Sequence, residues 1–224
     1  MNLLAIDTST CRASVSLAVD GVIYSEHEDH VSEHARCLLP MIERLMGSVD
    51  VSLSQLDGIV FGRGPGSFTG LRIACSVAKG FAYAHDLPVY PVSGLAAIAY
   101  DVYYNDSNLA PDTSVLAMID ARMHQVYWAL YDQKGGGLLE HVTPASDVMI
   151  DSLAPVVIAG VGLNDYFAEL PVAVHAHRVS ERVVYPEASA LIGLVQAGRV
   201  VPVTAALAAP VYVRNQVTQG VPRG

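Results

Sequence analysis

The second half of this 224-residue chain repeats the order of elements in its first half, and this repeat constrains the fold most strongly. Asp7 ends an apolar segment, and so does Asp120. Asp20 follows Asp7 by 13 residues, and Asp132 follows Asp120 by 12, each at the start of a turn that contains glycine. Two copies of one motif in a single chain predict two similar α/β halves.

Hydrophobic patterning predicts the elements of each half. In the first half we expect strands at residues 2–7, 13–20, 22–30, 58–61 and 89–92, with helices at 32–46, 68–84 and 93–104. In the second half we expect strands at 116–120, 126–131 and 156–159, a further strand after the glycine turn at 135–137, and helices at 143–153 and 188–197.

The order β-β-β-α-β-α, present twice, is that of the actin-like ATPase (ASKHA) architecture, which is built from two ribonuclease-H-like halves with mixed sheets. We therefore expect an N-terminal half at residues 1–104 and a smaller C-terminal half at 114–224. The polar segment NDSNLAPDT at 105–113 is the expected linker between them.

A glycine-rich run, GRGPGSFTGLR at residues 62–72, joins an expected strand to an expected helix. Free amide groups and the helix dipole make such a junction suitable for anions. The alternative is a tight turn in which Ser67 or Thr69 caps the helix. No lysine follows at the spacing of a P-loop. We expect a remnant of a nucleotide site, formed by Asp7, Thr8, Ser9, Gly64 and Gly66, because the chain is too short for the usual adenosine-binding insertions.

Composition narrows the classes of function. The net charge of −9, with two lysines, argues against a stand-alone nucleic-acid-binding protein. Three scattered cysteines are expected to be free thiols in a reducing cytoplasm. The segment after Met1 resembles a strand and not a signal peptide, and no apolar run is long enough to span a membrane.

Histidine and hydroxyl patterns provide candidates for metal binding and catalysis, but each has a simpler interpretation. His30 and His34 have helical spacing, yet the helix is expected to begin between them and no third ligand is evident. His175 and His177 alternate as they would on a strand. Ser67 lacks the surroundings of a catalytic serine. We therefore expect no metal site and no catalytic residues.

Two helices have apolar faces that predict a partner surface. Small residues and one aromatic recur at helical spacing in the helix at 68–84, and leucines and an isoleucine line the helix at 32–46. Small side chains allow helices to approach closely. The expected interface comprises Leu38, Leu39, Ile42, Leu45, Gly70, Ala74, Val77, Ala78 and Phe81. The alternative is that both helices only cover their own sheet.

Several motifs together resemble the bacterial TsaB (YeaZ) family over nearly the whole chain. They are LAIDTS at residues 4–9, His34 with LLP at 38–40, the run at 62–72, IDAR at 119–122 with VYW at 126–128, and PVYVRN at 210–215.

This resemblance implies a non-catalytic scaffold for threonylcarbamoylation of the adenosine beside the anticodon, in tRNAs that read codons beginning with A. It implies docking to the catalytic relative TsaD through the N-terminal helices, homodimers in isolation, and recruitment of the ATPase TsaE. ATP or ADP would bind only in that complex, tRNA would be reached only through it, and no membrane is involved. The HxxxH metal pair of TsaD follows its glycine loop, so it does not correspond to His30 and His34. A glycoprotease-like metallopeptidase and a free-standing ATP-binding protein are the alternatives.

Overall fold

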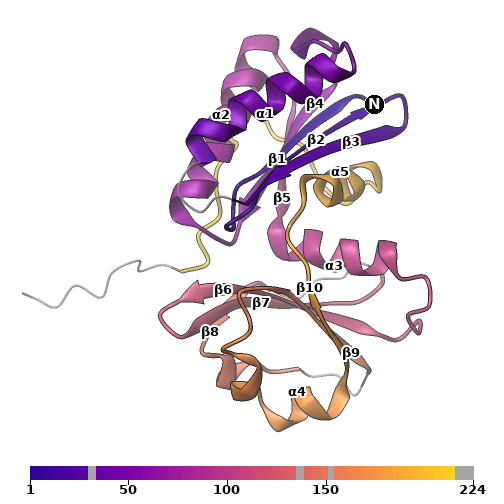
Figure 1. Cartoon of the computed structure of the whole chain (residues 1–224), viewed down its shortest axis with the longest axis vertical. Coiled ribbons are helices and arrows are strands. Elements are labelled where there is room, and N and C mark those ends of the chain that lie inside the picture. Colours follow the sequence, from indigo (N-terminus) through magenta and orange to yellow (C-terminus); the bar gives the residue numbers. More distant parts are fainter. Residues whose placement is uncertain (30–33, 135–138, 151–153, 215–224) are drawn as a thin grey trace, which may run out of the picture.

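Two five-stranded mixed sheets form the frame of the molecule (Figure 1). This computed structural model describes residues 1–29, 34–134, 139–150 and 154–214. The strand orders are β3-β2-β1-β4-β5 and β10-β9-β6-β7-β8, so the two halves have the same topology. The α/β class, the duplication and the actin-like architecture predicted from the repeat are confirmed.

In the first half, a meander of three antiparallel strands continues into two parallel strands. These are β1 (Leu3–Asp7), β2 (Ala13–Val19), β3 (Val22–Glu28), β4 (Gly58–Gly64) and β5 (Val89–Ser93). Strand β1 is buried on both faces, which explains its uninterrupted apolar sequence. Leu4 and Ile6 face one core, and Leu3 and Ala5 face another.

Helices cover both faces of the first sheet. Helices α1 (His34–Ser48) and α2 (Phe68–His85) lie on one side, with a 3₁₀ turn at Leu53–Gln55 before β4. On the other side lies α5 (Ala188–Gln196), which contacts β1, β2 and β4 although it comes from the C-terminal part of the chain. Helix α3 (Gly94–Asn105) packs between α5 and the second sheet.

The second half is formed by β6 (Ser114–Arg122), β7 (Gln125–Tyr131), β8 (His141–Thr143), β9 (Val156–Val161) and β10 (Arg178–Val183). Strand β8 is the third strand expected after the glycine turn, and that turn at 135–137 lies outside the described residues. Helix α4 (Val172–His177) and 3₁₀ turns at Ala145–Asp147 and Phe167–Glu169 pack on this sheet.

Two predictions for the second half are wrong. The helix expected at 143–153 is a single 3₁₀ turn over the described part, because one turn after Pro144 suffices to bury Ala145 and Val148. Residues 151–153 lie outside the described part. His175 and His177 belong to α4 and not to a strand; Pro171 starts that helix, and β10 begins only after it.

The described residues include no helix that is both long and apolar enough to cross a lipid bilayer.

Candidate functional site

The glycine-rich loop packs directly against the loop that follows β1. The Thr8 hydroxyl donates a hydrogen bond to the Gly70 carbonyl oxygen at 2.7 Å, and the Ser67 amide donates to the Ser9 carbonyl oxygen at 2.7 Å. A Cβ at Gly70 would lie 1.8 Å from the Thr8 carbonyl oxygen. Glycine is therefore required at this position by the close approach of two backbones.

Asp7, the first strand-end aspartate, is enclosed by this contact. Its side chain is only 1% exposed, and its Oδ1 accepts hydrogen bonds from the Ser9 amide at 2.8 Å and the Ser9 hydroxyl at 2.7 Å. Its Oδ2 has no hydrogen-bond partner and faces Gly62, where a Cβ would lie 1.8 Å away. Burial raises the pKa of Asp7 to about 7, although the hydrogen bonds from Ser9 oppose the rise.

The actin-like architecture implies a metal-bound nucleotide at this place, but the residues do not fit one. Asp7, Thr8 and Ser9 are all buried, so the Asp7 carboxylate is not presented to a metal-bound phosphate. Ser9 and Gly66 nevertheless border a cavity between the two halves. Of the two predicted glycines, Gly66 lies against Ser9, whereas Gly64 packs against Leu71 and Val211. That any of these residues contacts a nucleotide stays a prediction.

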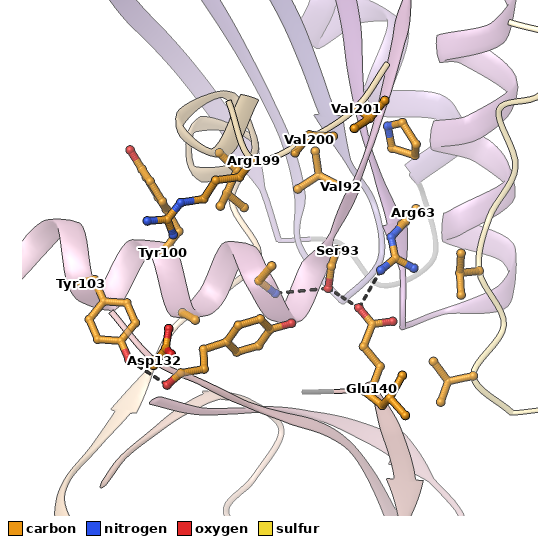
Figure 2. A pocket seen from close by; sticks show the side chains of 18 residues that line it. Arg63, Val92, Ser93, Tyr100, Tyr103, Asp132, Glu140, Arg199, Val200 and Val201 are labelled. Atoms are coloured by element: carbon orange, nitrogen blue, oxygen red, sulfur yellow. Dashed lines mark hydrogen bonds and ion pairs between the residues drawn. The ribbon is translucent and has the colours of Figure 1, made fainter. Parts of the chain in front are cut away.

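Two cavities lie between the halves, and both are lined by Val211 and Val213 of the C-terminal segment. The first, of about 700 Å³, is shown in Figure 2. In it, Arg63 Nη2 lies 3.0 Å from Glu140 Oε1, and the Ser93 hydroxyl also donates to Glu140. Because these groups come from opposite halves and satisfy one another, they connect the two halves.

The second cavity, of about 650 Å³, contains the other strand-end aspartate. Asp120 Oδ1 accepts hydrogen bonds from the Tyr166 hydroxyl at 2.8 Å and the Arg122 amide at 2.7 Å. The Arg122 guanidinium lies 3.3 Å from Asp120 Oδ2. Arg214, Tyr127, Tyr212 and Phe68 also line this cavity. So do residues of the two loops of the first half, namely Ser9, Thr10, Gly66, Ser67 and Thr69.

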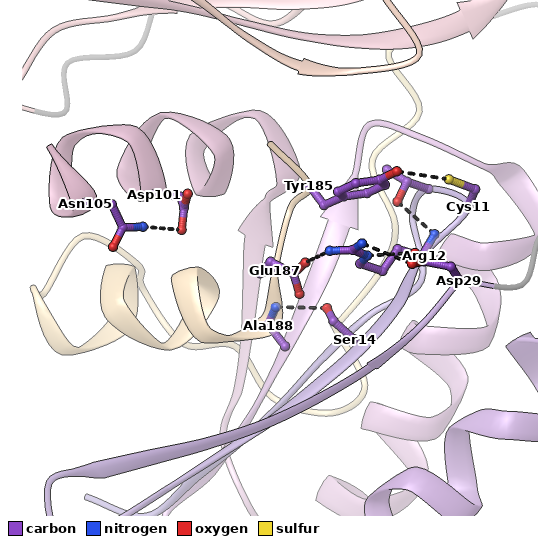
Figure 3. Close-up of polar contacts among 10 residues, drawn as sticks. Cys11, Arg12, Ser14, Asp29, Asp101, Asn105, Tyr185, Glu187 and Ala188 are labelled. Atoms are coloured by element: carbon purple, nitrogen blue, oxygen red, sulfur yellow. Dashed lines mark hydrogen bonds and ion pairs between the residues drawn. The ribbon is translucent and has the colours of Figure 1, made fainter. Parts of the chain in front are cut away.

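A cluster around Arg12 fixes α5 to the first half (Figure 3). The Arg12 guanidinium lies 2.8 Å from Asp29 and 2.7 Å from Glu187, and it stacks 3.9 Å above the Tyr185 ring. Sequence reasoning did not find this cluster. Its members are up to 175 residues apart, and no local pattern connects them.

A groove of about 450 Å³ lies between α1 and α2. It is lined by Ala35, Leu38, Leu39, Phe68, Thr69, Arg72, Ile73, Ser76 and Val77. Of the predicted interface, Leu39 is half exposed and Val77 and Phe81 are partly exposed.

The other six predicted interface residues are buried, and Leu38 among them still lines the groove. The remaining five face inward, which corrects their assignment to the surface: Ile42, Leu45, Gly70, Ala74 and Ala78. The small side chains of α2 allow the helix to lie close to β1 and β4 of its own sheet. The small-residue face of the helix is therefore covered by the sheet. The alternative that the helices cover their own sheet therefore accounts for most of the pattern.

Within the described residues, no group of three or more histidine, cysteine, aspartate or glutamate side chains could hold a metal ion. His34 is buried at the start of α1, and burial lowers its pKa. Its predicted companion His30 lies outside the described residues. Ser67 caps α2 by accepting a hydrogen bond from the Gly70 amide at 3.3 Å, as the turn interpretation expected.

Comparison with known proteins finds relatives whose descriptions concern tRNA threonylcarbamoylation. Residues 24–180 match a family model described as TsaD: tRNA N6-adenosine threonylcarbamoyltransferase. The tRNA threonylcarbamoyladenosine biosynthesis protein TsaB of Escherichia coli K12 is 40% identical over 62% of this chain and 58% of its own length. The TsaB protein of Bacillus subtilis is 34% identical over 67% of this chain and 63% of its own length. The matches thus span less than two thirds of these relatives.

A solved structure matches over a longer range. YeaZ from Pseudomonas aeruginosa is 39% identical, with a TM-score of 0.84 over 94% of this chain and 99% of that one. Together with the family model and the curated relatives, this agreement in sequence and fold shows that the chain belongs to the TsaB (YeaZ) family.

Proposed function

We propose that this chain is the non-catalytic scaffold subunit for tRNA threonylcarbamoylation, which docks to TsaD and recruits the ATPase TsaE. Membership in the TsaB family supports the pathway, since curated relatives are named for threonylcarbamoyladenosine biosynthesis. Because Asp7 is buried, its carboxylate would not face a bound nucleotide. This favours a scaffold role for the chain over nucleotide chemistry of its own. ATP or ADP would then bind in the assembly, and the assembly would bind tRNA in the cytoplasm.

The groove between α1 and α2 is the observation that carries the docking proposal. Leu39 is 50% exposed at this groove, next to Ile73 and Val77, while Thr69 and Ser76 supply polar groups. An apolar groove with polar neighbours fits the apolar face of a partner helix. We propose that TsaD provides that helix. When TsaD is absent, a second copy of this chain occupies the groove instead.

Co-purification with TsaD tests the docking. Leu39→Glu places a charge in the groove and should abolish capture of TsaD, because an unpaired carboxylate would be desolvated in the interface. Val179→Glu, at a residue 61% exposed on β10 in the other half, is the matched control and should capture TsaD normally. Equal capture by both variants would show that the groove is not the docking site.

Cellular threonylcarbamoyladenosine content tests the pathway itself. Cells depleted of their own copy should recover the modified nucleoside with the wild-type chain and with Val179→Glu, but not with Leu39→Glu. Recovery by none of the three would contradict the proposed function. The metallopeptidase alternative would require a bound metal, and the ATP-binding alternative would require tight binding of ATP to the isolated chain. Metal analysis and calorimetry measure these two properties.

A further inference from the structure

The cavity that contains Asp120 holds positive charge that its own carboxylate does not balance. Its lining includes Arg122 and Arg214, and Asp120 is the one carboxylate among the lining residues. Asp120 is occupied by Arg122 and Tyr166. Such a site is unusual in a chain with a net charge of −9.

The guanidinium of Arg214 contacts only neutral groups in the described part of the chain. It donates to Met123 Sδ at 3.4 Å, to the Arg122 carbonyl oxygen at 3.5 Å, and to Gln125 Oε1. A guanidinium held in place by neutral acceptors retains its full charge for an anion. Figure 1 shows the C-terminal segment, in yellow, passing beside α2 and running toward the second sheet.

The hairpin between β6 and β7 has a strained tip at the edge of this cavity. Arg122, Met123 and His124 have φ values of +63°, +57° and +56°, so three consecutive residues other than glycine are left-handed. This conformation is unfavourable for side chains of this size and is often found where a site holds a ligand. It leaves the Arg122 side chain 80% exposed. Met123 and His124 are the two central residues of the hairpin loop, where positive φ is expected, and Arg122 adds a third such residue at the register shift after Asp120.

Two partly exposed aromatic rings also line this cavity. Tyr212 and Phe68 are each about 40% exposed, and their ring centroids are 5.2 Å apart. The Arg72 guanidinium lies 3.8 Å from the centre of the Phe68 ring, and its Nε donates to the Tyr212 hydroxyl at 3.2 Å. Exposed rings interleaved with guanidinium groups bind unpaired bases and the phosphates between them.

We propose that this cavity binds an unpaired segment of RNA, with phosphates at Arg122 and Arg214 and a base stacked on Tyr212. This assignment rests on the proposed function, in which a tRNA is the substrate of the assembly. RNA is favoured over a free nucleotide because Asp7, the carboxylate at the expected nucleotide site, is buried. Ser9 and Gly66 of that site border the same cavity, so competition by a free nucleotide is part of the test.

RNA affinity of the full chain tests the proposal. The probe is a fluorescently labelled anticodon stem–loop RNA, measured by anisotropy at low salt. Arg214→Gln should weaken binding about fivefold and reduce the salt dependence by about one phosphate contact. Tyr212→Leu should weaken binding about tenfold through lost stacking. Arg199→Gln removes the same charge from the other cavity and should change affinity less than twofold.

Each other outcome overturns the proposal. Absence of binding by the wild-type chain does so, as does an equal loss in Arg199→Gln and Arg214→Gln, because the binding would then be non-specific. Competition by ATP at the affinity of the RNA would make a free nucleotide the ligand. Arg214→Gln should still capture TsaD and Leu39→Glu should still bind RNA, so failure of this site and failure of the docking proposal are separable. Circular dichroism checks that each variant is folded.

Discussion

The two strand-end aspartates occupy equivalent places in the duplicated motif, yet their surroundings differ. Asp7 is fully buried beneath the glycine-rich loop, and one of its oxygens has no partner. The side chain of Asp120 is 20% exposed in a cavity, and both of its oxygens have partners. The same local sequence, an apolar strand that ends in aspartate, therefore produces a closed site in one half and an open one in the other.

The loops that follow the neighbouring parallel strands cause this difference. After β4, Gly62, Gly66 and Gly70 allow the chain to lie directly on Asp7 and on the residues after it. After β9, Gly162 has a φ of +72° and turns the chain so that Tyr166 reaches Asp120 from the side. Glycine lies beside the aspartate in both halves, since a Cβ at Gly62 would lie 1.8 Å from Asp7 and a Cβ at Gly162 would lie 2.8 Å from Asp120. The difference in exposure therefore comes from the packing of the whole loop at 62–70 over Asp7.

A substitution that separates the glycine-rich loop from the loop after β1 is expected to have the largest effect on stability. Gly70→Ala places a Cβ 1.8 Å from the Thr8 carbonyl oxygen, and the two backbones must then separate. We expect the free energy of unfolding to fall by about 4 kcal/mol or more. Gly80→Ala, on the same helix with open space around it, should instead stabilise the protein by about 0.5–1 kcal/mol. Urea denaturation measures both, and a small loss in Gly70→Ala would contradict the closure.

The buried carboxyl of Asp7 is expected to make stability depend on pH. Its pKa rises from 3.8 to about 7 on folding, so the folded state binds this proton more tightly than the unfolded state. Stability from this group is fully present below pH 4 and is lost as the pH rises to 7, by roughly 3 kcal/mol. Asp7→Asn should therefore gain stability relative to the wild type over that range.

The matched variant in the open site separates this effect from the other carboxyl groups. Asp120→Asn retains Asp7, so its stability should keep the same decline between pH 4 and pH 7. Free energies of unfolding measured at several pH values compare the three proteins. Parallel curves for the wild type and Asp7→Asn would show that folding does not raise the pKa of Asp7.

The smallest expected effect concerns the hydrogen bond that holds Asp120. Tyr166→Phe removes the donor 2.8 Å from Asp120 Oδ1, and the Arg122 amide remains as a second donor. The cost should be about 1 kcal/mol, the usual value for a partly buried hydrogen bond. Tyr104→Phe, at an exposed residue, should be neutral within a few tenths of a kcal/mol. A neutral Tyr166→Phe would mean that the open site does not depend on this contact.

Local patterns predicted the strands and the helices of the first half well. The predicted helix at residues 68–84 matches α2 to within one residue, because glycine before it and Ser67 as its cap define its start. The prediction of a helix after β8 is wrong, because the spacing of the apolar residues there suits one 3₁₀ turn equally well. Periodicity alone does not distinguish these alternatives in a short segment.

The candidate site was harder to predict because its parts lie far apart in the chain. A small-residue face on α2 indicates a close neighbour, but it does not say whether that neighbour is a partner or the chain's own sheet. The structure places β1 and β4 there, and it leaves Leu39 at the groove. Arg214 and the tip after Asp120 meet only because the C-terminal segment crosses between the halves.

The sequence by itself determined the duplication, the strand-end aspartates and the glycine loop, because each depends on contacts or conformations within a few residues. Only the tertiary structure decided that Asp7 is buried while Asp120 is partly exposed in a cavity. It also decided that α5 packs on the first sheet and that Arg122 and Arg214 border one cavity. Burial and charge pairing depend on which distant segments meet, and that is fixed by how the two sheets and their helices pack together.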